Sequence, residues 1–156
     1  MRHLPRIARQ LMATPPIDVV SAESRVKYKV IRYVRDCTAQ NEPLLVLWYA
    51  PDLYYYSDRP FAGRLPFYME GYWSSERLER QNIDVIERDR PAIALIESDR
   101  EVTDLYTYPH LSAYLAESYH QIGTLSSEED RTIRVLARND RIPASIDPGS
   151  GWPCYR

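Results

Sequence analysis

The sequence predicts an α/β domain: a small layered sheet with a parallel βαβ core, flanking helices and a C-terminal edge hairpin. Two continuous apolar runs of strand length, a helical pattern between them and two alternating segments downstream carry this prediction. The chain of 156 residues has a formal net charge of -2, and 44% of its residues are hydrophobic. These values are typical of one soluble globular domain, and they argue against a disordered chain and against a dedicated nucleic-acid binder.

The first predicted element is a helix that begins after Ser21 or Ser24 and ends near Ala39, because its apolar residues recur at helical spacing. Residues 44–50 and 91–97 are continuous apolar runs. Continuous rather than alternating hydrophobicity indicates burial on both faces, as in a parallel sheet covered by helices.

A helix from about Ser75 to Asp89, with Ser74 as its N-cap, separates the two strands and completes a βαβ crossover. A second helix is expected over residues 110–118. Residues 119–125 and 132–138 alternate between apolar and polar side chains, which predicts a hairpin at the edge of the sheet.

Three regions follow from these boundaries. Residues 1–20 are expected to form a basic, juxtamembrane-like segment and linker, residues 21–138 the α/β domain, and residues 139–156 an extended or disordered tail. Cys37 is interpreted as a small buried hydrophobe, while Cys154 lies in the tail. No apolar run reaches the roughly 20 residues that span a bilayer, and no signal peptide is evident.

The segment 52–73 is the part of the sequence that could carry chemistry. It follows the carboxyl end of the first strand, the edge at which open α/β sheets bind ligands, and the second strand brings Glu97 and Asp99 to the same edge. Aromatic faces beside carboxylates and arginines suit a sugar or a sugar phosphate. The candidate ligand-binding residues are Asp52, Tyr54, Tyr55, Tyr56, Asp58, Arg59, Arg64, Trp73 and Asp99.

The same residues also have a purely structural interpretation. Aromatic side chains dominate core burial, Tyr54 to Tyr56 would fit one helical turn, and Asp58 with Arg59 would form a local ion pair or turn. The sequence shows no catalytic residue set, no metal ligands and no glycine-rich phosphate loop, so no cofactor is expected. A small enzyme that uses Asp52, Asp58, Glu97 and Asp99 is the least supported hypothesis.

The order of the motifs resembles the C-terminal soluble domain of bacterial membrane glycosyltransferases of the protein mannosyltransferase and aminoarabinose-transferase-like superfamily. The resemblance covers about residues 24–138 and includes a Tyr-Tyr-x-Ser-x-Arg order at residues 54–59. The other segments that carry it are residues 30–39, 44–53, 90–96, 108–119 and 135–138.

The resemblance implies an extracytoplasmic accessory domain at the bacterial inner membrane, part of a membrane protein yet soluble as the chain given. The parent enzyme would use polyprenyl-phosphate sugars, and the domain would have no activity in isolation, because no family catalytic residue maps onto this sequence. The implied partners are the membrane-embedded catalytic domain of the same protein and a lipid-linked sugar or glycan acceptor, with no nucleic acid. The membrane part is missing, so the chain is either an excised domain with an added Met1 or a free-standing relative. The alternative function is a stand-alone carbohydrate- or partner-binding module.

Overall fold

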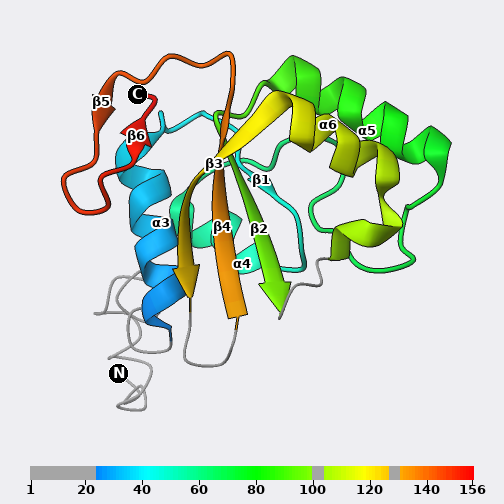
Figure 1. Cartoon of the computed structure of the whole chain (residues 1–156), viewed down its shortest axis with the longest axis horizontal. Coiled ribbons are helices and arrows are strands. Elements are labelled where there is room, and N and C mark those ends of the chain that lie inside the picture. The colour runs from blue at the N-terminus through cyan, green and yellow to red at the C-terminus, as the bar shows by residue number, and fades with distance from the viewer. Residues whose placement is uncertain (1–23, 100–103, 127–130) are drawn as a thin grey trace, which may run out of the picture.

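The computed structural model describes residues 24–99, 104–126 and 131–156 (Figure 1). Its central sheet has four strands in the order β1-β2-β4-β3. These strands are β1 (Leu45–Val46), β2 (Ile93–Asp99), β3 (Tyr119–Ser126) and β4 (Arg131–Arg138). The pair β1 and β2 is parallel, whereas β4 runs antiparallel to both β2 and β3. The predicted α/β class, with a parallel pair and a C-terminal hairpin, is therefore confirmed.

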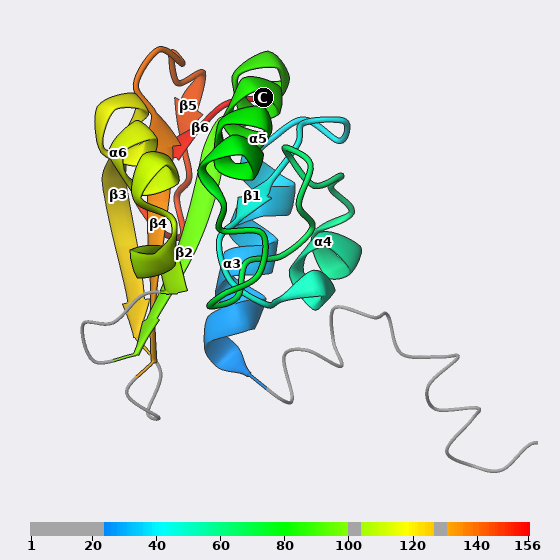
Figure 2. The same cartoon turned by 90° about the vertical axis from the view of Figure 1, so that its right-hand side faces the viewer.

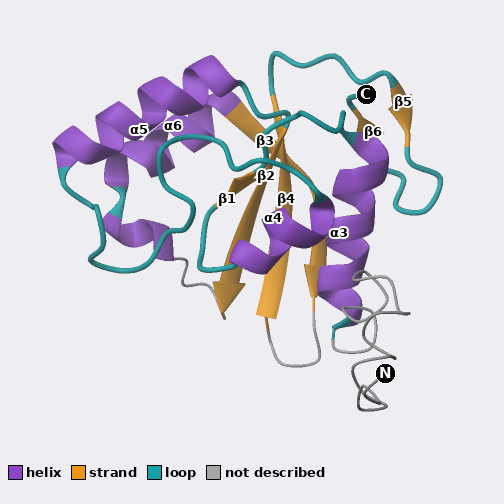
Figure 3. Cartoon of the chain, turned by 180° about the vertical axis from the view of Figure 1, so that it is seen from behind, coloured by secondary structure: helices purple, strands orange, loops and turns teal. Residues whose placement is uncertain are grey.

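Helices cover both faces of this sheet. One face packs against α3 (Arg25–Cys37) and the short α4 (Pro51–Ser57), which lie in front of the sheet in Figure 3. The other face packs against α5 (Glu76–Asp89), the 3₁₀ helix η1 (Asp104–Thr107) and α6 (Pro109–Ser118). Figure 2 shows α4 and α6 at opposite sides of the molecule. Two apolar cores result, because successive side chains of a strand point to opposite faces.

The ends of the helices follow ordinary capping chemistry. The Ser24 hydroxyl accepts a hydrogen bond from Lys27 N at 3.3 Å, so Ser24 is the N-cap of α3. Helix α6 has no cap from its own N-cap side chain. Instead the buried Glu79 carboxylate on α5 accepts from His110 N at 3.0 Å and from Leu111 N at 3.1 Å. This carboxylate satisfies the free N–H groups of α6 and joins the two helices.

Several element boundaries differ from the sequence-based expectation. Only Leu45 and Val46 of the first apolar run form a strand, because the chain turns into α4 at Pro51. The expected helical turn at Tyr54 to Tyr56 is confirmed within α4. The N-cap of α5 is Ser75 rather than Ser74. In the hairpin, β3 forms the edge of the sheet and β4 lies inside it.

The C-terminal residues are folded, which corrects two expectations. The strands β5 (Ser145–Ile146) and β6 (Pro153–Cys154) form a second, two-stranded sheet beside α3 (Figure 1). Cys154 forms a disulfide with Cys37, across a sequence separation of 117 residues. Cys37 is buried as expected, but it is also disulfide-bonded, and residues 139–156, expected to be extended or disordered, contain a two-stranded sheet. Burial of Cys154 and Tyr155 explains the order, since both side chains complete the core beneath α3.

Candidate functional site

Helix α4 carries most of the candidate residues, and Tyr54 is its anchor to the sheet. The Tyr54 hydroxyl accepts a hydrogen bond from Val46 N at 3.2 Å and lies 3.5 Å from Val46 O. Burial raises the pKa of Tyr54 well above its usual value, so the phenol stays neutral. Tyr56 packs against the same core, whereas Tyr55 is 72% exposed and contacts only the edge of the Tyr56 ring among the described ring pairs. Of the three tyrosines, Tyr55 alone presents most of its ring to solvent.

Arg59 has a guanidinium that is buried and fully engaged with protein atoms. It donates to Thr38 Oγ1 at 2.9 Å, to Thr38 O at 2.9 Å and to Arg35 O at 3.0 Å. It also donates to the backbone oxygens of Ser57 and Asp58, at 3.2 and 2.8 Å. Burial lowers the pKa of Arg59 from its ordinary value. Arg59 thus ties the end of α3 to the end of α4, and none of these bonds leaves a donor pointing to a cleft.

The charged candidates on the surface have local partners. Asp52 forms an ion pair with Lys27 at 2.8 Å. Asp58, the left-handed C-cap of α4, accepts a hydrogen bond from Gln40 at 3.2 Å. Arg64 lies beside α5, where its Nη1 is 3.4 Å from Gln81 Oε1. The side chain of Asp99 lies outside the described residues.

Trp73 belongs to a different group of aromatic side chains. Its ring centroid is 5.0 Å from that of Phe67, which is in turn 5.1 Å from that of Tyr49, and Tyr72 lies 6.1 Å from Trp73. Tyr49, Tyr72 and Trp73 are between 38% and 59% exposed. No ring contact between this group and the three tyrosines of α4 occurs among the described residues. The described ring contacts therefore do not join the tyrosines of α4 and Trp73 into one aromatic cluster.

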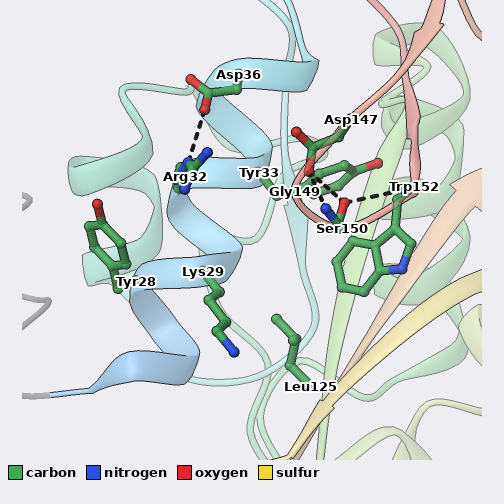
Figure 4. Close-up of a pocket in the computed structure, with 10 residues that line it drawn as sticks. All are labelled: Tyr28, Lys29, Arg32, Tyr33, Asp36, Leu125, Asp147, Gly149, Ser150 and Trp152. Carbon is green, nitrogen blue, oxygen red and sulfur yellow. Dashed lines mark hydrogen bonds and ion pairs between the residues drawn. The ribbon is translucent and has the colours of Figure 1, made fainter.

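A pocket of about 270 Å³ lies between α3 and the C-terminal segment (Figure 4), and we call it the α3–tail pocket. Basic, acidic and aromatic side chains line it together, with one contribution from β3. The lining residues are Tyr28, Lys29, Arg32, Tyr33, Asp36, Leu125, Asp147, Gly149, Ser150 and Trp152.

Trp152 forms one wall of this pocket, and its ring packs against Tyr33 and Gly123. Its ring meets that of Tyr33 edge to face, at a centroid distance of 5.1 Å. The Tyr33 hydroxyl donates to Pro153 O at 2.5 Å. The indole also lies against Gly123 at the β3 irregularity, where a Cβ atom would stand 2.1 Å from Cε2 of Trp152. Only glycine allows this approach, so the bulge in β3 and the tail are fitted to each other.

Charged and polar side chains line the pocket on the tail, beside Trp152, and across from it on α3 (Figure 4). Asp147 accepts hydrogen bonds from Ser150 Oγ at 2.6 Å and from Ser150 N at 2.8 Å (Figure 4). These bonds, with a smaller contribution from the Arg32 guanidinium, hold the pKa of Asp147 below its usual range. Arg32 itself lies 3.4 Å from Asp36 on the same helix and is 57% exposed. Hydrogen-bond donors and acceptors therefore stand beside aromatic faces, an arrangement that suits a polar ring.

Sequence reasoning missed this pocket because it assigned no structure to the tail. Two signals pointed to it. The chain has two cysteines, an even number, and Trp152 and Tyr155 flank Cys154 in a segment otherwise rich in Pro and Gly. Large aromatic side chains are the residues that most favour burial, and they are unusual in a disordered segment.

Within the described ranges, no group of three or more His, Cys, Asp and Glu side chains could hold a metal ion. No helix in that part of the chain is both long and apolar enough to cross a bilayer. Comparison of the chain with protein-family models, with curated proteins and with solved structures finds no match. The functional interpretation therefore depends on the geometry of the pocket and on the order of the sequence motifs.

Proposed function

We propose that this chain is an extracytoplasmic accessory domain of a polyprenyl-phosphate-sugar-dependent membrane glycosyltransferase, and that its α3–tail pocket binds a saccharide. The domain does not catalyse transfer by itself. The observation that carries the proposal is the Cys37–Cys154 disulfide, which fastens the tail that forms one wall of the pocket. The order of motifs from residue 30 to residue 138 supports the choice of enzyme class.

The disulfide supports the compartment. Disulfides persist in oxidising environments, such as the bacterial periplasm, and are rare in the reducing cytosol. The bond joins the last turn of α3 to β6, and Tyr155 N donates to Cys37 O at 2.7 Å directly beside it. The covalent link and the hydrogen bond thus act on the same junction, which indicates a structural disulfide rather than an accidental contact.

The electrostatics of the pocket support a binding role. A general acid or base works best when its pKa lies near the working pH. In the pocket both pKa shifts move away from neutral pH. Burial raises the pKa of the Tyr33 hydroxyl, and hydrogen bonds from Ser150 lower the pKa of the Asp147 carboxyl. Both groups are stabilised in the protonation state that they already have at neutral pH. They can hold a ligand by hydrogen bonds without transferring a proton to it.

The size and lining of the pocket support a saccharide. At about 270 Å³ it is just below the roughly 300–1,000 Å³ of typical small-molecule sites, which suits one or two sugar units. Tyr28 and Trp152 offer aromatic faces for the C–H side of a pyranose ring. Asp147 and Ser150 offer oxygens to its hydroxyl groups, and Lys29 and Arg32 would attract a phosphate on the sugar.

Isothermal titration of the chain with mannose, aminoarabinose, galactose and their 1-phosphates tests the proposal. We expect saturable binding of at least one sugar, and weaker or absent binding to the Trp152→Leu variant. Trp73→Leu is the matched control, because Trp73 is a part-exposed tryptophan outside the pocket, and this variant should bind like the wild type. Loss of binding in both variants would contradict the proposed site. The absence of saccharide binding by the wild type would contradict it as well.

The stand-alone binding module is the second candidate, and the pocket is compatible with it, because α3, β3 and the C-terminal segment suffice to form its walls. The sequence of the gene distinguishes the two candidates. If the reading frame that contains this sequence encodes no apolar spans of membrane length, the accessory-domain form fails and the stand-alone module is retained. Saccharide binding is expected in either case.

A further inference from the structure

A second pocket, also of about 270 Å³, lies on the opposite face of the sheet, under α6. We call it the α6–sheet pocket. Its walls are mainly apolar and come from β2, β3, β4, η1 and α6. The lining residues are Ile96, Leu105, Ser112, Leu115, Ala116, Tyr119, Gln121, Arg134 and Leu136.

Arg134 is the charged residue of this pocket, and it lies on the inner strand β4. Its Cα partners are Ile96 on β2 and Thr124 on β3, so it stands in the middle of the sheet rather than at an edge. Its Nε is buried and has no hydrogen-bond partner. Among the side chains that the structure describes, no other buried nitrogen or oxygen atom lacks such a partner. A buried donor of a charged group that lacks an acceptor is unfavourable.

Two arginines elsewhere in the described structure are well buried and show how this fold satisfies a guanidinium group, whereas the Arg134 side chain as a whole is only partly buried. Arg138, four residues along the same strand and on the same face, is 4% exposed and donates to Asp140, Tyr114 and Glu87 at 2.8, 2.9 and 2.8 Å. Arg59 donates to five protein oxygens. Arg134 differs from both, because the described residues that line its pocket are mostly apolar and include no Asp or Glu.

We propose that the α6–sheet pocket binds a small organic anion that carries a short apolar chain, with its carboxylate or phosphate on the Arg134 guanidinium. An oxyanion accepts from the planar guanidinium in a paired geometry, and such charge-assisted bonds are the strong ones. The apolar chain lies against Ile96, Leu115 and Leu136. The volume restricts the ligand to a small molecule, since drug-sized ligands occupy roughly 300–1,000 Å³.

This site is independent of saccharide binding in the α3–tail pocket. The two pockets lie on opposite faces of the sheet and share no lining residue. Failure of one ligand to bind therefore leaves the other prediction standing.

Nuclear magnetic resonance titration of the wild-type chain tests the proposal with four probes: hexanoate, butyl phosphate, 1-hexanol and acetate. Saturable shifts of the Arg134 Nε–H signal and of the Ile96, Leu115 and Leu136 methyl signals are expected with hexanoate, butyl phosphate or both. The anion that binds tells which oxyanion the site prefers. 1-Hexanol should bind about tenfold or more weakly, because it lacks the charge, and acetate should bind weakly because it lacks the chain.

The matched variants are Arg134→Met, which keeps an unbranched apolar side chain, and Arg80→Met, which removes an exposed arginine of α5 outside the pocket. Arg134→Met should lose hexanoate and butyl phosphate binding, and Arg80→Met should retain it. Equal binding of hexanoate and 1-hexanol, no saturable shift with either anion, or unchanged binding by Arg134→Met would overturn the proposal. If Arg134→Met does not fold, the wild-type comparison of hexanoate with 1-hexanol decides the matter.

Discussion

Reduction of the Cys37–Cys154 disulfide is expected to lower the free energy of unfolding by about 2–5 kcal/mol. The bond closes a loop across 117 residues, so it restricts the unfolded chain strongly. The loop-entropy relation gives about 5 kcal/mol for a loop of this length. Measured values for native disulfides extend downward from that figure, because an unfolded chain keeps some residual structure.

The assay is urea unfolding of the wild-type chain with and without a reductant, followed by tryptophan fluorescence. The control is the Cys37→Ala/Cys154→Ala variant, which should unfold at a lower urea concentration and be insensitive to the reductant. Reduction should also release the tail and abolish the α3–tail pocket, since four of its lining residues lie between Asp147 and Trp152. A change below about 1 kcal/mol, with saccharide binding intact after reduction, would refute this account of the disulfide.

Three further predictions follow from single groups. Arg59→Met should lower the free energy of unfolding by about 2–4 kcal/mol, measured by urea unfolding, because it leaves buried carbonyl oxygens of α3 without a donor. Gly123→Ala should displace the Trp152 indole and so weaken saccharide binding. The loss in the free energy of unfolding should be smaller than the loss in binding free energy, since the ring can rotate away from the new Cβ. Unchanged saccharide binding in a titration would contradict this. The stability that the buried tyrosines contribute should be complete below about pH 10 and be lost as the pH rises further, because burial raises their folded-state pKa while the unfolded phenols ionise near pH 10. Phenolate absorbance should show these residues ionising only as the chain unfolds; they are Tyr33, Tyr54, Tyr68 and Tyr119.

Periodicity in the sequence predicts the fold class well, because the signal is local. The helical stripe of Val30, Ile31 and Val34 faces the core as expected, and the run from Ile93 to Ile96 is buried in the sheet. The first apolar run fails as a full strand for a physical reason. Trp48 and Ala50 are buried by tertiary packing before Pro51 begins α4, although Tyr49 is exposed, and burial without strand pairing leaves the same apolar pattern.

The candidate site is harder to predict, because the α3–tail pocket is formed by contacts between distant segments of the chain. The composition of segment 52–73 and its place after the first strand predict a site there. In the structure Tyr54 is hydrogen-bonded to the first strand, Arg59 is buried between α3 and α4, and Trp73 packs with Phe67. The α3–tail pocket joins Tyr33 to Trp152, more than a hundred residues apart. No local pattern encodes such a pairing, and its signals in the sequence are the second cysteine and the aromatic residues that flank it.

The α3–tail pocket as a saccharide site is tested most directly by intermolecular nuclear Overhauser effects between the Trp152 indole and a bound sugar. The sugar used is the one that binds most tightly in the titration panel. The account predicts contacts from the indole ring protons to the C–H face of the sugar, together with contacts from Tyr28 or Tyr33. Contacts that appear instead at Tyr55 or Trp73, or the absence of any contact at a saturating sugar concentration, would contradict it.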